Sequence, residues 1–202
     1  MLHLAVFISG RGSNLQAIHA AIRSGRLAAS IGLVVSHSAA AGGLAWAANE
    51  MIDTAVIDPR DGDALLDLLV MKNINFIALA GYLKLVPSQV VSAFRNRIVN
   101  IHPALLPSFG GKGMYGHFVH EAVIASGAKF SGATVHIVSD EYDRGPIVHQ
   151  DVVPVTDDDT AETLAGKVLV IEHKIYPEAL QFFAENRVSV SLQRTFIQPK
   201  ST

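Results

Sequence analysis

The clearest indication of the fold is the segment Leu4-Ala5-Val6-Phe7-Ile8-Ser9-Gly10-Arg11-Gly12-Ser13-Asn14. Its first five residues are all apolar, as in a strand that is buried on both faces of a sheet. A serine and a glycine end this strand, and Leu15, Ile18 and Ile22 then recur at helical spacing. The stretch therefore predicts a buried strand, a glycine-rich turn and a helix in direct succession.

Strands and helices continue to alternate along the chain. The sequence predicts strands at 31–35, 54–57, 76–80 and 98–101, with helices near 43–50, 61–69 and 90–94 between them. This alternation is typical of an α/β protein. We expect an open, mostly parallel twisted sheet with helices on both faces and a Rossmann-like N-terminal half.

The second half of the chain is less regular. It predicts strands at 133–138 and 148–155, with Pro154 indicating an edge strand. A long helical pattern opens at Thr160 and is expected to be kinked or restarted at Pro177. Without repeats or linkers, we expect one domain over residues 1–187, and we assign no structure to the tail 188–202.

Composition excludes several classes of protein. The 202 residues carry 16 Lys+Arg and 18 Asp+Glu, a net charge of −2, and half of them are hydrophobic. A disordered chain and a nucleic-acid-binding protein both fit this balance poorly. The absence of cysteine excludes disulfides, thiolate metal sites and a cysteine nucleophile.

One uncharged stretch is long enough to cross a membrane. Leu27–Asn49 holds no charged residue, but Ser36-His37-Ser38 and Gly42-Gly43 interrupt it with polar and small residues. The N-terminus lacks the positive run of a secretory signal. We therefore expect a cytoplasmic protein that binds no membrane.

The turn between the first strand and helix has the composition of an anion-binding site. Glycines let the backbone approach a ligand closely, and free amides at the start of a helix favour a phosphate. Ser13 and Asn14 add side-chain hydrogen bonds, or they merely cap the helix. A tight turn without a ligand is the alternative.

A dinucleotide fits this turn less well than a single phosphate group. The dinucleotide fingerprint needs a third glycine where this sequence has Leu15. It also needs an acidic residue after the second strand, where the sequence has Ser36-His37-Ser38. Both departures favour a mononucleotide-type phosphate.

Asn100-Ile101-His102 forms the second candidate site, at the end of a predicted strand. Residues two apart on a strand point to the same side, so the amide and the imidazole can converge on one reacting centre. An amide donor beside a titratable imidazole suits the stabilisation of an oxyanion during proton transfer. Such a triplet is weak evidence by itself, since a histidine at a strand end is often structural.

Asp143 is the third candidate, in an acidic segment ahead of Gly145-Pro146 that also suits a solvated turn. If Asp143 faces His102, the Asp143 carboxylate holds the imidazole and raises the pKa of His102.

His120, His136 and His173 are weaker candidates for a functional role. No histidine pair has a metal-ligand spacing, and no nucleophile motif is present, so neither a metal nor a covalent intermediate is expected.

Four segments together carry a family resemblance. They are Ile8-Ser9-Gly10-Arg11-Gly12-Ser13-Asn14-Leu15-Gln16, Leu79-Ala80-Gly81-Tyr82, Asn100-Ile101-His102-Pro103-Ala104-Leu105-Leu106-Pro107 and Asp143-Arg144-Gly145-Pro146-Ile147. In this order and spacing they resemble the phosphoribosylglycinamide formyltransferase family of purine biosynthesis. The likeness covers about Leu2 to Arg187.

This resemblance implies an activity. The formyl group of 10-formyltetrahydrofolate, the co-substrate, would pass directly to the amine of glycinamide ribonucleotide, without a metal. The partners would be these small molecules, and the protein would be a monomer or a homodimer. The resemblance implies a ribonucleotide phosphate-binding half over about 1–99 and a folate and catalytic half over about 100–187.

The resemblance also implies roles for individual residues. Asn100, His102 and Asp143 would be catalytic, with a protonated His102 stabilising a tetrahedral oxyanion. The residues that would bind the ribonucleotide are Gly12, Ser13, Asn14, Pro103 and Glu172. Those that would clasp the folate, mostly through backbone groups, are Gly81, Tyr82, Leu83, Lys84, Leu85, Val86, Val138, Ser139, Asp140 and Glu141.

Other functions remain possible at this point. A formyltetrahydrofolate hydrolase shares the folate-side motifs but usually carries an extra N-terminal module. A methionyl-tRNA formyltransferase needs a further C-terminal domain and a basic surface. A nucleotide-binding module without activity would explain the glycine-rich turn and leave Asn100, His102 and Asp143 without a role.

Overall fold

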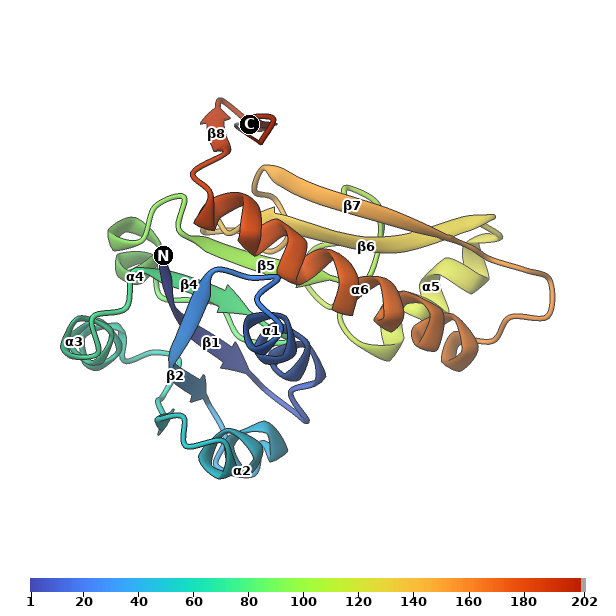
Figure 1. Ribbon diagram of the computed structural model, residues 1–202. Coiled ribbons are helices and arrows are strands. Elements are labelled where there is room, and N and C mark those ends of the chain that lie inside the picture. The colour runs from blue at the N-terminus through green and yellow to red at the C-terminus, as the bar shows by residue number, and fades with distance from the viewer. Residues whose placement is uncertain (201–202) are drawn as a thin grey trace.

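The computed structural model describes residues 1–200 and forms an α/β fold around one seven-stranded sheet (Figure 1). The strands are β1 (Leu2–Ile8), β2 (Ala29–Ser36), β3 (Thr54–Val56), β4 (Phe76–Leu79), β5 (Ile98–His102), β6 (Phe130–Ile137) and β7 (Ile147–Pro154). Their order in the sheet is β3-β2-β1-β4-β5-β6-β7. The first five strands pair in parallel, whereas β6 and β7 are antiparallel. The expected open, mostly parallel sheet is confirmed.

Helices cover both faces of this sheet. They are α1 (Ser13–Arg23), α2 (Gly42–Asn49), α3 (Gly62–Met71), α4 (Ser88–Ala93), α5 (His117–Ser126) and α6 (Ala161–Ala184). The alternating side chains of β1 separate two cores: Leu4, Val6 and Ile8 pack with α1 and α6, and Ala5 and Phe7 pack with α3 and α4. All five are fully buried, which explains the unbroken apolar run.

Local signals in the sequence set several helix ends. The backbone N–H of Ala64 donates to Asp61 Oδ1 at 3.0 Å, so Asp61 caps α3 as its position predicts. Thr160 and Thr163 form a capping box at the start of α6. The expected restart at Pro177 is wrong, because α6 runs unbroken through this residue. Pro177 is buried, and the packing of α6 against the sheet outweighs the lost backbone hydrogen bond.

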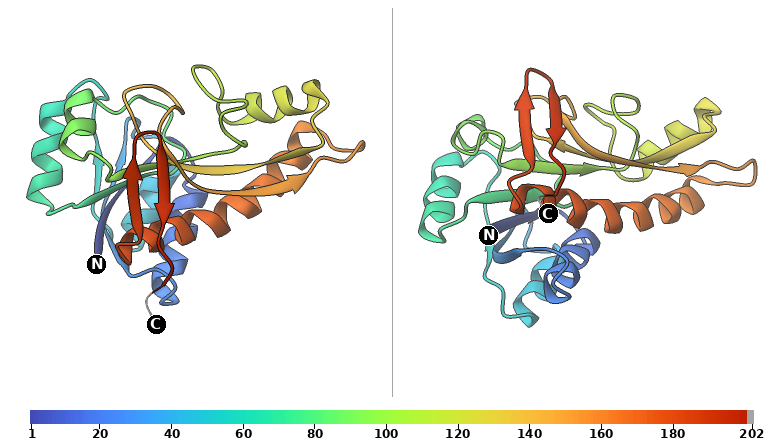
Figure 2. Two further views of the ribbon diagram at one scale, coloured as in Figure 1. Left: turned by 90° about the horizontal axis from the view of Figure 1, so that it is seen from above. Right: turned by 45° about the horizontal axis from the view of Figure 1, so that its top comes forward.

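The tail folds into a hairpin of β8 (Val188–Ser191) and β9 (Arg194–Ile197), which stands out from the main sheet (Figure 2). Thr195 Oγ1 donates to the carbonyl oxygen of Ile147 at 2.5 Å and ties the hairpin to β7. Residues 201–202 of the tail lie outside the described residues. β7 lies at the sheet edge, as Pro154 predicts.

The uncharged stretch 27–49 forms β2 and α2 with a loop between them. Among residues 1–200, no helix is both long enough and apolar enough to cross a membrane.

Candidate active site

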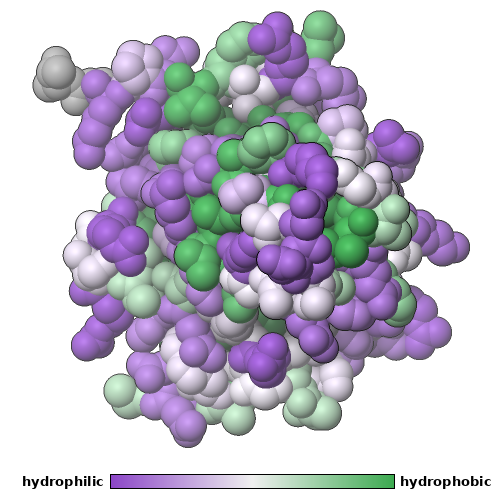
Figure 3. Space-filling model, turned by 90° about the vertical axis from the view of Figure 1, so that its right-hand side faces the viewer, coloured by the Kyte–Doolittle hydropathy of each residue, from purple (hydrophilic) through white to green (hydrophobic). Residues whose placement is uncertain are grey.

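A cavity of about 910 Å³ opens where the parallel strands β1, β4 and β5 end. The loops that follow these strands line it, together with the loop after β6 and one side of α6. The face of the molecule at this end of the strands carries apolar patches among polar side chains (Figure 3). A ligand site at this edge is what an open α/β sheet predicts.

The turn between β1 and α1 forms one end of this cavity, from Gly10 to Asn14. Gly12 has φ +77°, a left-handed conformation that glycine adopts without strain. A Cβ at Gly12 would lie 3.2 Å from the Cα of Gly43, so α2 packs closely against the turn. Within the described residues 1–200, no side chain caps the N-terminus of α1, and no acidic residue lies in its first turn. Its amides are therefore free for an anion.

Asn14 joins this turn to α6. It is buried, and its Nδ2 donates to Glu172 Oε2 at 2.6 Å, while its Oδ1 has no partner among residues 1–200. Burial raises the pKa of Glu172 to about 6, against the smaller opposite effect of the Asn14 hydrogen bond. Both side chains line the cavity, so a polar ligand can satisfy the free oxygen.

Asn100, His102 and Asp143 all line the cavity. His102 Nδ1 lies 3.6 Å from Asp143 Oδ1, although the two residues come from β5 and from the loop before β7. The Nε2 of His102 contacts the carbonyl oxygen of Phe109 at 2.8 Å, and because a carbonyl only accepts, this nitrogen carries the proton. The backbone N–H of Gly111 donates to Asp143 Oδ2 at 2.9 Å.

Asp143 raises the pKa of His102, as expected, but the net shift in the unliganded protein is downward. Burial lowers the pKa of His102, and this outweighs the raising effects of Asp143 and the Phe109 carbonyl. Burial alone would raise the pKa of Asp143, but the imidazoles of His136 and His102 and the N–H of Gly111 together lower it. At pH 7 the unliganded site therefore pairs an ionised carboxylate with a largely neutral His102.

Two buried hydroxyl groups hold the chain around these residues. The fully buried Tyr176 of α6 places its hydroxyl 2.9 Å from the Leu79 carbonyl and 3.2 Å from the Val99 carbonyl, so it ties together β4 and β5.

The second hydroxyl belongs to Thr134 of β6. Its Oγ1 donates to the Ala104 carbonyl at 2.6 Å and accepts from the Leu106 N–H at 3.0 Å. Asn100 and the loop after His102 are thereby fixed to the sheet.

Two histidines that the sequence indicated only weakly line the cavity. His136 is 2% exposed, and its Nε2 lies 3.1 Å from Asn100 Nδ2 and 3.5 Å from Asp143 Oδ1. His120 is also buried and lines the cavity, with no partner for its Nδ1 among residues 1–200. The antiparallel pairing of β6 with β5 brings His136 opposite Asn100, and no local signal in the sequence reveals that pairing.

The two segments assigned to the folate lie along the cavity. All of residues 81–86 line it, as do Val138, Ser139 and Glu141, whereas the exposed Asp140 does not. Leu83 and Leu85 are half-exposed there, and the Leu83 N–H donates to Ser9 Oγ at 2.9 Å. Pro103 also borders the cavity. Apolar side chains beside free backbone groups suit a flat, partly polar ring.

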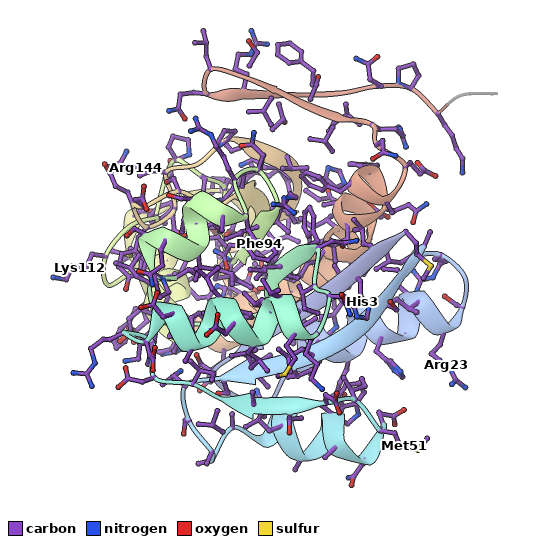
Figure 4. All side chains as sticks on the ribbon, turned by 90° about the vertical axis from the view of Figure 1, so that its left-hand side faces the viewer. His3, Arg23, Met51, Phe94, Lys112 and Arg144 are labelled. Atoms are coloured by element: carbon purple, nitrogen blue, oxygen red, sulfur yellow. The ribbon has the colours of Figure 1, made fainter. Side chains whose placement is uncertain are left out.

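A loop that the sequence did not single out closes another side. Residues 111–117 line the cavity, and Gly111, Gly113 and Gly116 all have positive φ. Lys112 extends its side chain to the outside of the molecule, at the end opposite to Arg23 (Figure 4). Among residues 1–200, no group of three or more His, Asp or Glu side chains could hold a metal ion.

The family model described as formyl transferase matches residues 2–180, a range that includes every residue of the cavity. This match, together with the fold, defines the class of the protein as a formyl transferase. The chain is 46% identical over 193 residues to the chloroplastic phosphoribosylglycinamide formyltransferase of Vigna unguiculata, covering 92% of this chain and 62% of that relative. It therefore spans less than two thirds of that plant relative.

Bacterial proteins match over nearly their whole length. The phosphoribosylglycinamide formyltransferase of Haemophilus influenzae is 35% identical, covering all of this chain and 96% of that one. The crystal structure of glycinamide ribonucleotide transformylase 1 from Symbiobacterium toebii superimposes with a TM-score of 0.92 at 39% identity, covering 98% of this chain and 95% of that chain. The chain belongs to the phosphoribosylglycinamide formyltransferase family.

Proposed function

We propose that this protein transfers the formyl group of 10-formyltetrahydrofolate to the amine of glycinamide ribonucleotide. The products are formylglycinamide ribonucleotide and tetrahydrofolate, and the step belongs to de novo purine biosynthesis. The observation that carries the proposal is the meeting of Asn100, His102 and Asp143 in one cavity with the anion-binding turn Gly12–Asn14. A substrate with a phosphate at one end and an amine at the other fits this arrangement.

The reaction forms one bond and breaks another at the same carbon. The substrate amine attacks the formyl carbon, and the carbonyl oxygen becomes the oxyanion of a tetrahedral intermediate. The amine nitrogen then loses a proton, the bond from the formyl carbon to folate N10 breaks, and N10 gains a proton. Asn100 and His102 donate hydrogen bonds to the oxyanion, which is where charge develops.

His102 becomes protonated during this reaction. Its Nδ1 faces the carboxylate of Asp143 at 3.6 Å, and the developing oxyanion adds a second negative charge. Both charges favour the protonated imidazole, which burial disfavours in the free protein. The Phe109 carbonyl occupies the Nε2 donor before substrate binds, so substrate must displace it to use that donor.

The substrates occupy the two halves of the chain. Gly12, Ser13 and Asn14 hold the phosphate in the half formed by about 1–99. Glu172 accepts hydrogen bonds from the ribose, and Pro103 lies beside the ribonucleotide. The folate lies between 81–86 and 138–141, where apolar side chains and free backbone groups line the cavity. No step requires a metal ion.

One assay distinguishes the candidate functions. The protein is incubated with 10-formyltetrahydrofolate, with and without glycinamide ribonucleotide, and tetrahydrofolate is measured. Folate product that depends on the ribonucleotide supports the transferase. Product in its absence identifies a hydrolase, and no product under either condition leaves a binding module.

The surroundings of the protein follow from the same proposal. Its partners are the two small-molecule substrates, and it acts as a monomer or a homodimer in the cytoplasm. The plant relative named above is described as chloroplastic, so location varies within the family.

A further inference from the structure

His136 is a buried titratable side chain for which the reaction above has no role. It lies on β6 directly opposite Asn100 of β5 in the antiparallel register, so both side chains leave the sheet on the same face. His136 is 2% exposed and borders the cavity. Its two ring nitrogens both have neighbours, which makes it possible to place its proton.

The backbone fixes the tautomer of His136. Its Nδ1 lies 3.0 Å from the carbonyl oxygen of Ile137, and a carbonyl only accepts, so Nδ1 carries the hydrogen. In the neutral imidazole, Nε2 is then an acceptor. Asn100 Nδ2 lies 3.1 Å from this nitrogen, and Asp143 Oδ1 lies farther away at 3.5 Å. Of these two neighbours, only the Asn100 amide can donate a hydrogen to an Nε2 that carries none, and it is also the closer one.

This contact decides which way the Asn100 amide faces. An amide NH₂ group has two hydrogens, and an acceptor at Nε2 engages only one of them. The other hydrogen remains available to the cavity. Without an acceptor beside it, the amide is free to rotate by 180° and present its oxygen to the reacting carbon, where an oxyanion would be repelled.

We infer that His136 is a positioning residue, whose Nε2 accepts a hydrogen bond from the Asn100 amide and holds it so that the second N–H points at the oxyanion. The expected effect of His136 on turnover rests on the proposed formyl transfer. The tautomer of His136 and its contact with Asn100 exist in the protein without substrate. His136 itself touches no reacting atom in this scheme. Its effect on turnover passes through Asn100.

The kinetic experiment compares His136→Leu with His136→Gln. Leucine removes the acceptor, and we expect kcat to fall about 100-fold, the typical cost of a misplaced catalytic group, with KM for the ribonucleotide nearly unchanged. Glutamine offers a carbonyl oxygen in place of Nε2, so it should recover about 10-fold of that loss. His149→Leu, on the neighbouring strand β7 and outside the cavity, is the matched control and should keep normal kcat.

A double-mutant cycle separates positioning from general damage to the fold. If His136 acts through Asn100, His136→Leu should change kcat less than about 2-fold in an Asn100→Ala background. Losses that multiply in the double variant would overturn the inference, and so would normal kcat in His136→Leu. If His136→Leu does not fold, the cycle is run with His136→Gln and the tautomer measurement decides.

The tautomer can be read without any turnover. A long-range ¹H–¹⁵N spectrum of the unliganded, histidine-labelled protein should show His136 protonated at Nδ1 with a bare Nε2. A proton on Nε2 would refute the inference even in an active enzyme. Absence of formyl transfer by the wild-type protein would instead refute the proposed function and leave this measurement valid.

Discussion

At the scale of single residues, strand geometry explains how Asn100 and His102 come to line the same cavity. They are separated by one residue on β5, so both side chains reach the same side of the sheet. Asp143 reaches them from a loop, and it has φ +56°, an uncommon conformation for a residue other than glycine. The hydrogen bond from Gly111 to its carboxylate helps to hold it there.

Replacing an oxyanion donor tests this arrangement directly. We expect Asn100→Ala or His102→Ala to lower kcat by a factor of about 100–1,000, because one lost donor costs about 2.7–4 kcal/mol in the transition state. KM for the ribonucleotide should change little, since the phosphate turn is intact. Steady-state kinetics with both substrates measures this, and near-normal turnover in either variant contradicts the assignment.

Glu172 shows how a buried carboxyl group costs stability. Its pKa rises to about 6 from an ordinary 4.5 because the carboxyl group is buried. A group with a raised pKa favours folding below the ordinary value, and this contribution is lost as the pH rises through 6. The shift corresponds to about 2 kcal/mol against the folded state at pH 8.

We expect Glu172→Gln to remove this penalty. Urea unfolding at pH 8 should show a variant that is about 2 kcal/mol more stable than the wild type, with the difference vanishing near pH 4. Ribonucleotide binding should weaken, because the ribose loses a charged acceptor. Glu178→Gln changes an exposed carboxyl group on the same helix and should shift stability by less than about 0.5 kcal/mol. Equal effects of the two substitutions would contradict the explanation.

At the scale of elements, the turn from β1 into α1 depends on two close backbone approaches. The Gly43 N–H donates to the Gly10 carbonyl at 3.0 Å, and the Cα of Gly43 closes on Gly12. The first helical turns of α1 and α2 thus meet beside the cavity. Glycine at positions 12 and 43 follows from this contact between two elements that are separate in the sequence.

Gly12→Ala and Gly25→Ala make a matched pair for testing the turn. Both glycines have positive φ, +77° and +73°, so alanine is strained at either position by about 1 kcal/mol. A Cβ at Gly25 meets no atom of the described residues within 4 Å, and Gly25 follows the far end of α1. We expect a similar loss of thermal stability in both variants, or a larger one at Gly12. Only Gly12→Ala should raise KM for the ribonucleotide, and an equal KM in both would argue against phosphate binding at the turn.

At the scale of the whole molecule, the cavity joins elements from both halves of the chain. β1 and α1 supply the glycine-rich turn, β5 and the loop before β7 supply the candidate catalytic groups, and α6 spans both. A ligand that contacts all of these should stabilise the entire domain, because it binds the folded state alone.

Thermal unfolding can measure this coupling. Glycinamide ribonucleotide at 100 times its Kd should stabilise the protein by about 2.7 kcal/mol, which is a Tm increase of about 5–11 °C for a chain of this size. The same compound without its phosphate is the control and should give a clearly smaller shift at equal concentration. Equal shifts would mean that the phosphate is not bound at the turn.

Much of the fold could be predicted because its signals are local. Apolar runs indicate buried strands, Asp61 and Thr160 mark helix starts, and Pro154 indicates an edge strand. The hairpin at 188–197 escaped prediction because its strands are short and largely exposed. The long helix α6 was predicted, but a restart at Pro177 was wrong because tertiary packing outweighs the helix-breaking effect of one proline.

The α/β class, the glycine-rich turn and the residues that carry the family resemblance can be read from the sequence alone, since each depends on neighbours along the chain. The contact between His136 and Asn100 and the lowered pKa of His102 follow from the folded structure. Both outcomes depend on which strands pair and how much water they exclude. These properties arise between residues that are far apart in the sequence and adjacent only after folding.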